Sequence, residues 1–310
     1  MKRLLLFIIL IFLIPIIIIS IFYKYDIKNN ITGFITNKKE NNIKIRILKS
    51  DNTVENIDLE EYLIGVVSSE VPVSFEKEAL KAQAVASRTY ALKQIENNKD
   101  KEYDVTDNVL SQVYSNKDKL RERWGEEFDN NYKIIEDIVK ETKGEYLSYN
   151  DDFIYAFFFS TSNGKTEDNK NVFGEDLPYL KSVDSSFDEE ESPSFYKTIS
   201  FSKEDFYNSL NIEYSDKLEV TDILRTESNR VYSIKINGNE FKGREFQKRL
   251  SLRSNDFDIN EKEDSIEITT KGFGHGVGLS QYGANALAKQ KKDYKEILEY
   301  YYQGTKLKKL

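Results

Sequence analysis

One stretch of the hydrophobic pattern predicts a helix that ends on a carboxylate. Leu59, Leu63 and Val66 recur three and four residues apart, which is the spacing of one helix face. Pro72 ends this helix, because the residue before a proline is pushed out of the helical region. Glu70 is the next position of the same row and lies in or just beyond the last turn. The pattern therefore places a carboxylate where an apolar side chain is expected.

A second helix is predicted from an N-cap at Ser74 to about Gln94. Small side chains recur along it and allow neighbouring elements to pack closely, so we expect this helix at the centre of the core. Arg88 lies among small and apolar neighbours, and we expect it to be buried and paired. The small residues are Ala79, Ala82, Ala84, Ala86 and Ala91.

The remaining pattern is typical of a mixed α+β fold with mostly antiparallel sheet. Strands are expected at residues 31–35, 43–48, 145–149, 153–159, 219–224, 231–236 and 265–270, helices at 117–143, from Ser202 and at 243–250, and turns at Asn150–Asp151 and Gly238–Asn239. Residues 184–194 are acidic and lack a period, so they are expected to be solvated surface. A smaller lobe is expected at about residues 195–260 of this core domain.

An almost unbroken apolar run occupies residues 4–23. About twenty such residues suffice to cross a bilayer, and no small-x-small cleavage site follows, so we expect an uncleaved transmembrane helix. Lys2 and Arg3 favour a cytoplasmic N-terminus, although Lys24 on the other flank weakens this bias. We therefore expect a single-pass membrane protein. Its anchor would be residues 1–24, its tether with the first strands residues 25–56, and its extracytoplasmic domain residues 57–310.

Composition narrows the chemistry that this chain can perform. It contains no Cys and one His, so neither a disulfide nor an ordinary zinc site made of histidine and cysteine can form. Its net charge is -8 with a pI near 5.1, and it gathers no basic segment for phosphates, which argues against nucleic acid. Catalysis must therefore rest on carboxylates, amides, hydroxyls and basic side chains.

Two interpretations of Glu70 remain open from its position alone. Partial burial and the negative end of the helix dipole both disfavour the ionised carboxylate, so its pKa should be raised. A carboxylic acid that stays protonated near neutral pH can act as a general acid. Alternatively, Glu70 turns to solvent or pairs with a basic side chain such as Arg88, as most glutamates at helix ends do.

A glycine-rich loop follows the strand expected at residues 265–270. Its glycines occupy every second position, and no frame gives the spacing of a dinucleotide or phosphate-binding loop, which argues against a nucleotide site. His275, the only histidine, lies in the middle. The loop is either a tight packing turn with an ordinary buried histidine, or a groove wall that admits an extended polymer. The glycines are Gly272, Gly274, Gly276 and Gly278.

These segments together resemble the peptidoglycan lytic transglycosylases of the stage II sporulation protein D type, a family that includes amidase enhancers. The similarity is carried by GVVSSEVPVSFEKEALKAQAVASRTYAL, SQVYS, FFFSTSNGKTEDNKNVFGEDLPYLKSV, GREFQKRLSLRSNDFDI and GFGHGVGLSQYGANALA. They occur in the family's order and span nearly the whole predicted ectodomain.

The resemblance implies cleavage of glycan strands between N-acetylmuramic acid and N-acetylglucosamine, which leaves an anhydro-muramic end. The family's catalytic acid falls on Glu70, in the segment SSEVP. One carboxylate suffices, because it protonates the leaving oxygen and then accepts the proton of the muramic acid's own hydroxyl. Glycoside hydrolases need two carboxylates, since one must activate water or attack the sugar.

The resemblance also implies a substrate groove lined by residues of the matched segments. Some family members hold zinc with His and Cys near the segment that matches residues 159–167, but Ser160 and Ser162 stand here, so we expect no metal and no cofactor. Glu70, the glycine loop and the serines are expected to face one groove. The expected substrate-binding residues are Arg88, Gln112, Ser160, Ser162, His275, Ser280, Gln281 and Tyr282.

The family further implies peptide-stripped strands as substrate, engulfment during sporulation, and the stage II sporulation proteins P and M as partners. The localisation would then be the mother-cell membrane, with the catalytic domain facing the intermembrane space. A different class of function stays open, namely a non-catalytic glycan-binding activator of an amidase that keeps the groove and dispenses with Glu70 as an acid. A membrane-anchored structural protein would explain the anchor but not the inward carboxylate.

Overall fold

The computed structural model describes residues 43–108 and 111–310 of the chain. Residues 44–309 form one compact unit. The predicted anchor at residues 1–24 and the predicted strand at 31–35 lie outside the described residues, and the division into anchor, tether, ectodomain and lobe stays a prediction. Within the part of the chain that is described, none of the helices is both long and apolar enough to cross a membrane.

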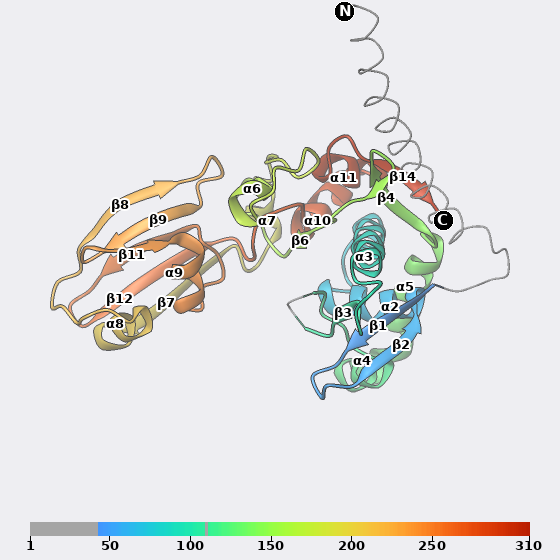
Figure 1. The fold of residues 1–310 in the computed structure, drawn as a ribbon, viewed down its shortest axis with the longest axis horizontal. Helices are drawn as coiled ribbons and strands as arrows, with labels where there is room; N and C mark the ends of the chain where they lie inside the picture. The colour runs from blue at the N-terminus through green and yellow to red at the C-terminus, as the bar shows by residue number, and fades with distance from the viewer. Residues whose placement is uncertain (1–42, 109–110) are drawn as a thin grey trace, which may run out of the picture. The chain divides into compact units, whose positions relative to one another are not determined.

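The first described elements are a strand pair and a helix (Figure 1). That helix ends at Glu70, as predicted. Strands β1 (Lys44–Leu48) and β2 (Val54–Asp58) pair antiparallel, and β3 (Val105–Thr106) adds to β1 in parallel. Helix α2 (Leu59–Glu70) follows directly, with the Asp58 side chain accepting from the first backbone N–H groups. The carboxylate of the N-cap therefore fixes where the helix begins, and Pro72 lies just past its end.

Helix α3 (Lys77–Asn97) is the centre of the core, as its small residues predict. It packs against α2, α5 (Phe128–Glu141), α10 (Gln281–Lys289), α11 (Tyr294–Tyr301) and strand β4 (Glu145–Tyr149). Its residues from Ala79 to Leu92 are almost all buried. The predicted N-cap at Ser74 is wrong, because a turn closed by the Phe75 N–H and the Pro72 carbonyl intervenes. The N-cap residue is Glu76, whose backbone N–H donates to Asn285 Oδ1 at 2.7 Å, so a distant side chain completes this end.

The predicted helical hairpin and β-hairpin are both present, although the second strand of the β-hairpin, predicted over residues 153–159, covers only Asp152–Phe153. Helices α4 (Lys117–Trp124) and α5 (Phe128–Glu141) are joined by a short 3-10 helix, η1 (Gly125–Glu127). Strand β4 (Glu145–Tyr149) pairs antiparallel with β5 (Asp152–Phe153) and with the terminal strand β14 (Lys306–Lys309). Asn150 and Asp151 adopt φ of 50° and 71°, so the predicted turn is confirmed.

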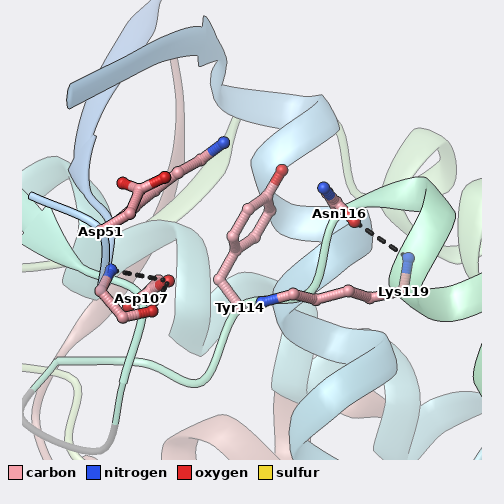
Figure 2. Close-up of a pocket in the computed structure, with 7 residues that line it drawn as sticks. Asp51, Asp107, Tyr114, Asn116 and Lys119 are labelled. Atoms are coloured by element: carbon pink, nitrogen blue, oxygen red, sulfur yellow. Dashed lines mark hydrogen bonds between the residues drawn. The ribbon is translucent and has the colours of Figure 1, made fainter. Parts of the chain in front are cut away.

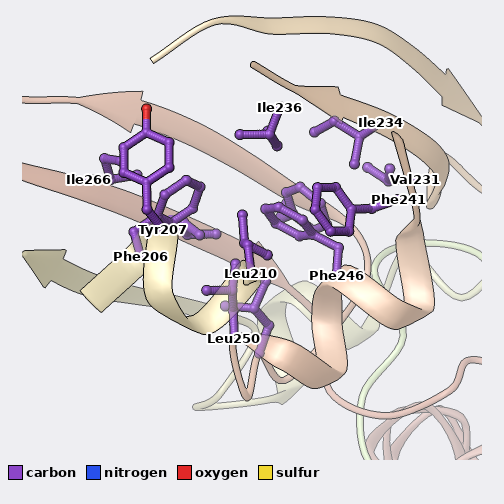
Figure 3. Close-up of a cluster of buried hydrophobic side chains, with 13 residues drawn as sticks. Phe206, Tyr207, Leu210, Val231, Ile234, Ile236, Phe241, Phe246, Leu250 and Ile266 are labelled. Carbon is purple, nitrogen blue, oxygen red and sulfur yellow. The ribbon is translucent and has the colours of Figure 1, made fainter. Parts of the chain in front are cut away.

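Residues 196–271 enclose a hydrophobic core of their own (Figure 3). Two three-stranded antiparallel sheets, ordered β10-β9-β8 and β11-β12-β7, are joined by α8 and α9, whose Phe206, Leu210 and Phe246 pack against Ile234 and Ile266. The turn predicted at Gly238–Asn239 is wrong by one residue, because the observed turn is at Asn237–Gly238. The elements are β7 (Tyr196–Ser202), α8 (Lys203–Leu210), β8 (Val220–Arg225), β9 (Val231–Ile236), β10 (Asn239–Lys242), α9 (Gly243–Arg249), β11 (Phe257–Glu261) and β12 (Ser265–Lys271).

The glycine loop leads into a parallel strand pair that connects segments far apart in the sequence. Strand β13 (Leu279–Ser280) pairs with β6 (Phe158–Phe159), and helix α10 (Gln281–Lys289) follows it. Short helices α6 (Asn169–Val172) and α7 (Asp188–Glu191), and then α11 (Tyr294–Tyr301), complete the chain. Apart from β1–β3 and β6–β13, the named strand pairs are antiparallel, so the predicted α+β class with mostly antiparallel sheet is confirmed.

Asp188 contradicts the prediction that residues 184–194 are solvated surface. Its side chain is fully buried and accepts from Ser162 N at 2.8 Å, from Ser185 Oγ at 2.6 Å and from Ser280 Oγ. Ser185 in turn contacts Tyr301 Oη at 2.8 Å. The carboxylate thus ties the ends of β6 and β13 together, and burial raises its pKa to about 6.

We expect Asp188 to make the fold less stable as the pH rises. Its folded pKa lies above its ordinary value of 3.8, so the folded state holds the proton more tightly, and this advantage is lost between about pH 4 and 6. Asp188→Asn removes this pH-dependent loss. The free energy of unfolding at pH 7 minus that at pH 4 should therefore be more positive in the variant than in the unchanged protein, by up to about 3 kcal/mol. Urea unfolding at both pH values measures this, with the exposed Asp184→Asn as control. Equal pH slopes in all three proteins would contradict it.

Candidate functional site

Glu70 is partly buried at the end of α2, and two donors from distant segments reach its carboxylate. The Val113 backbone N–H donates to Oε1 at 2.8 Å, and Gln281 Nε2 donates to Oε2 at 3.4 Å. Val113 belongs to the loop before α4, and Gln281 is the first residue of α10. The fold therefore brings the carboxylate and its two donors together from three parts of the chain.

A buried chain of hydrogen bonds stands behind these donors. Gln281 Nε2 also donates to Gln83 Oε1 at 3.5 Å, and Gln83 Nε2 donates to Ser87 Oγ at 3.0 Å. The Ser87 carbonyl accepts from Gln112 Nε2 at 3.4 Å, and Gln112 Oε1 accepts from Tyr62 Oη at 3.2 Å. These side chains are locked by one another in the core, so the groups around Glu70 are positioned before a ligand arrives.

The raised pKa predicted for Glu70 is confirmed. Burial raises the pKa of this carboxyl, while the hydrogen bonds from Val113 and Gln281 lower it to a smaller extent. The alternative in which Glu70 pairs with Arg88 is wrong, because Arg88 Nη2 lies 2.6 Å from Glu60 Oε2 and its side chain is fully buried. Across the described residues, no basic side chain forms an ion pair with Glu70.

Arg123 is a residue beside the site that the sequence analysis missed. Its guanidinium donates to the Ser68 carbonyl at 3.0 Å and to Ser115 Oγ at 2.7 Å. It therefore satisfies a free carbonyl at the end of α2 and places a positive charge at the negative end of the helix dipole. Nothing in the local pattern of α4 distinguishes this arginine from other charged residues on a solvated helix.

The four glycines of the loop serve close packing. All four have positive φ, between 76° and 112°. A Cβ on Gly274 would lie 2.8 Å from Phe159 Cβ, one on Gly276 2.5 Å from Arg230 Cζ, and one on Gly278 2.0 Å from the Phe157 carbonyl oxygen. The loop thus presses against β6 and a buried arginine, which supports the packing-turn interpretation of the glycines over the groove-wall interpretation.

His275 is held among aromatic rings. Its Nδ1 accepts from the Val277 N–H at 3.1 Å, and the rings of Phe157, Phe159 and Phe173 lie within 6.1 Å of its ring centre. Burial lowers its pKa to about 4, with a further contribution from the nearby charge of Arg244, so the ring is neutral at neutral pH. These contacts do not include Glu70, and the predicted groove shared by the two residues stays a prediction.

The other predicted binding residues fall into two groups, those with buried side chains and those with partly exposed ones. Arg88, Gln112, Ser162 and Ser280 are at most 1% exposed. Side chains so buried cannot touch a sugar in this conformation, so we reassign them from substrate binding to the scaffold.

Three predicted residues lie at the start of α10 or contact it. Gln281 binds Glu70 directly, and the neighbouring Tyr282 N–H donates to the Ser160 carbonyl at 3.1 Å. The Tyr282 ring meets the edge of Phe75 at 5.0 Å. Ser160 and Tyr282 are partly exposed, so both stay candidates for substrate contact, together with His275.

A pocket lies elsewhere, between the β1–β2 turn and the start of α4 (Figure 2). Lys49, Asp51, Asp107 and Lys119 give it mixed charge, and Tyr114 forms one side. Glu70 is not part of its lining. Two of its polar side chains are already engaged, since Lys49 pairs with Glu55 and Asn116 caps α4.

Comparison with known proteins identifies the family. The sequence profile described as Stage II sporulation protein (SpoIID) matches residues 49–149, which include Glu70, Gln83, Ser87 and Val113. The stage II sporulation proteins D of Bacillus subtilis and Bacillus amyloliquefaciens are 42% and 43% identical, over 87% and 86% of this chain and 80% and 79% of their own lengths. An amidase enhancer of Bacillus subtilis is 28% identical over 79% of this chain and 40% of its own length. With such identity across most of both sequences, the chain belongs to the stage II sporulation protein D family.

Proposed function

We propose that this protein is a lytic transglycosylase that cleaves peptidoglycan strands between N-acetylmuramic acid and N-acetylglucosamine and leaves anhydro-muramic ends. The observation that carries the proposal is Glu70, a partly buried carboxyl whose pKa burial raises and whose two oxygens each meet a positioned donor. Membership of the family supports a role in sporulation and at the cell wall.

The surroundings of Glu70 suit a group that must both give and take a proton. Burial favours the protonated acid, which can donate to the leaving glycosidic oxygen. The Val113 N–H and Gln281 stabilise the carboxylate that remains. That carboxylate then accepts the proton of the muramic acid hydroxyl that closes the anhydro ring, so neither water nor a second carboxylate is needed.

The site's location and partners are part of the proposal. We propose that the apolar run at residues 4–23 anchors the protein in the membrane and that the catalytic domain acts outside the cytoplasm. In that setting the substrate would be peptide-stripped strands at the sporulation septum. Stage II sporulation proteins P and M would be the partners.

The second candidate function is a non-catalytic activator of a cell-wall amidase. The similarity to an amidase enhancer across 79% of this chain favours it. An activator needs the scaffold and a glycan-binding surface but no titratable proton on Glu70. The two functions therefore differ in what they require of this one side chain.

Glu70→Gln should abolish cleavage and preserve the fold. The amide fills the same volume but has no proton to donate, so the turnover of purified glycan strands should fall by at least about a hundredfold. Mass spectrometry measures the products, which are lighter than hydrolysed sugars by one water. The exposed Glu61→Gln on the same helix is the matched control and should cleave normally. Normal turnover by Glu70→Gln would remove Glu70 from the mechanism, whereas no cleavage by the unchanged protein would favour the activator.

Cleavage should also fall as the pH rises through the pKa of Glu70, because only the protonated form is a general acid. The Gln281 hydrogen bond lowers this pKa, so Gln281→Met, which removes the donor, should raise it further. The alkaline limb of kcat/KM against pH should move to higher pH in that variant. An unmoved limb, or a shift to lower pH, would show that another group titrates.

Chelators should change neither activity nor melting temperature. No group of three or more His, Cys, Asp or Glu residues placed to hold a metal occurs within residues 43–108 and 111–310. Dialysis against EDTA, followed by cleavage assays and thermal unfolding, checks this expectation. Inactivation that added zinc reverses would reveal metal ligands of another kind.

A further inference from the structure

Two exposed phenylalanine rings lie at the glycine loop, Phe273 within it and Phe173 against its His275, and an arginine stacks on each ring. Arg244 of α9 lies 5.4 Å from the ring centre of Phe173, and Arg253 lies 5.1 Å from that of Phe273. Phe173 is 44% exposed and Phe273 is 41% exposed, which is unusual for such side chains. Large apolar rings kept at the surface beside a cation are candidates for ligand contact.

Arg244 has no acidic partner among the described residues. One N–H of its guanidinium donates to the Val172 carbonyl at 2.8 Å, and burial lowers its pKa without any acidic group raising it. Arg249 on the same helix also lies 5.4 Å from a ring, that of Phe241, but is paired with Glu245 at 2.8 Å. In a chain of net charge -8, a stacked arginine without a carboxylate is an open place for an anion.

The Phe173 ring belongs to an aromatic row that reaches α3. It stacks on Phe157 at 4.6 Å, and Phe157 stacks on Tyr155 at 5.7 Å. Phe157 also lies 6.2 Å from Tyr90, which is one turn beyond Ser87 on the helix that supports the donors of Glu70. The row therefore connects to α3, the helix whose Gln83 holds the Gln281 donor of the proposed acid.

Lys93 lies 5.6 Å from the Tyr155 ring centre but is paired with Glu96 at 2.7 Å, which leaves Arg244 as the cation of this row that is free to face an incoming anion. His275 meets the Phe173 ring edge-on at 5.4 Å and is neutral at neutral pH. Arg230 lies behind the glycine loop, fully buried, and donates to the Lys165 carbonyl and to Ser228 Oγ. The Arg244 guanidinium keeps further N–H donors in one plane, a geometry that matches the two oxygens of a carboxylate.

We propose that Phe173 and Arg244 form a subsite that binds a carboxylate carried on a sugar strand, with the ring against the sugar face and the guanidinium on the carboxylate. The inference rests on the proposed function, since it assumes a glycan substrate. In peptidoglycan the carboxylate comes from one of two sources. It is the lactyl group of muramic acid where the peptide has been removed, or an acidic residue of the stem peptide where the peptide remains.

Binding of defined tetrasaccharides to the full chain tests the subsite. The Glu70→Gln background prevents cleavage, and calorimetry compares four ligands: peptide-free muramyl tetrasaccharide, the same sugar with its lactyl carboxylates amidated, the same sugar with stem peptides, and chitotetraose. Arg244→Gln should weaken binding of the peptide-free muramyl sugar about tenfold and leave the amidated sugar and chitotetraose unchanged. Phe173→Ala should weaken all four, because the ring contact does not require a carboxylate.

Arg249→Gln is the matched control, because this arginine is stacked on the same helix but already holds a carboxylate. It should leave the order of the four affinities unchanged. Dependence on Arg244 with the peptide-free sugar identifies the lactyl carboxylate, and dependence only with the peptide-bearing sugar identifies the stem. Three outcomes would overturn the subsite. Arg244→Gln could lose affinity equally for charged and neutral sugars, it could lose no affinity at all, or no sugar could bind to the protein. Cleavage assays on Glu70→Gln decide the proposed function separately, so the two failures are distinguishable.

Discussion

The hydrogen bond between Gln281 and Glu70 is the contact on which the site depends. It joins residues 211 positions apart and connects the end of α2 to the start of α10. Helix α10 can begin there only because β13 pairs with β6 and Ser280 caps the helix through the Gly283 N–H. Gln83 then fixes the Gln281 amide from α3. The carboxylate is thus placed by the whole fold and not by its own helix.

Helix α3 carries a buried cation that binds groups on neighbouring elements. Arg88 is fully buried and binds Glu60 with two nitrogens, at 2.9 and 2.6 Å, and it also donates to the carbonyls of Glu145 and Val139. Removing one partner of such a pair leaves an uncompensated charge in the core, which is far more costly than the pair's net contribution. The pair therefore fixes how α2, α3, α5 and β4 are aligned with one another. This alignment also determines where Gln83 and Ser87 lie relative to Glu70.

Elements with a strong local pattern could be predicted, and long-range partners could not. The end of α2 at Glu70 follows from Pro72 and the row of apolar residues, and the Asn150–Asp151 turn follows from residues that tolerate positive φ. Arg88 was expected to be buried, but its partner Glu60 is set by the angle between two helices. Asp188 was mistaken for solvated surface because its neighbours Glu189 and Glu190 are acidic and exposed, whereas its own burial depends on Ser162 and Ser280.

In the glycine loop, the glycines serve packing, and the residues that can contact a ligand lie between them. Its glycines are needed where the backbone meets β6 and Arg230, so they explain the fold and not a ligand. The side chains between them point elsewhere, since Phe273 is exposed beneath Arg253 and His275 meets the ring of Phe173. Of the residues between the glycines, Phe273 reaches the surface, His275 is partly exposed and Val277 is fully buried. A motif whose glycines pack against the core can therefore still present an aromatic side chain at the surface, and the two roles constrain different residues.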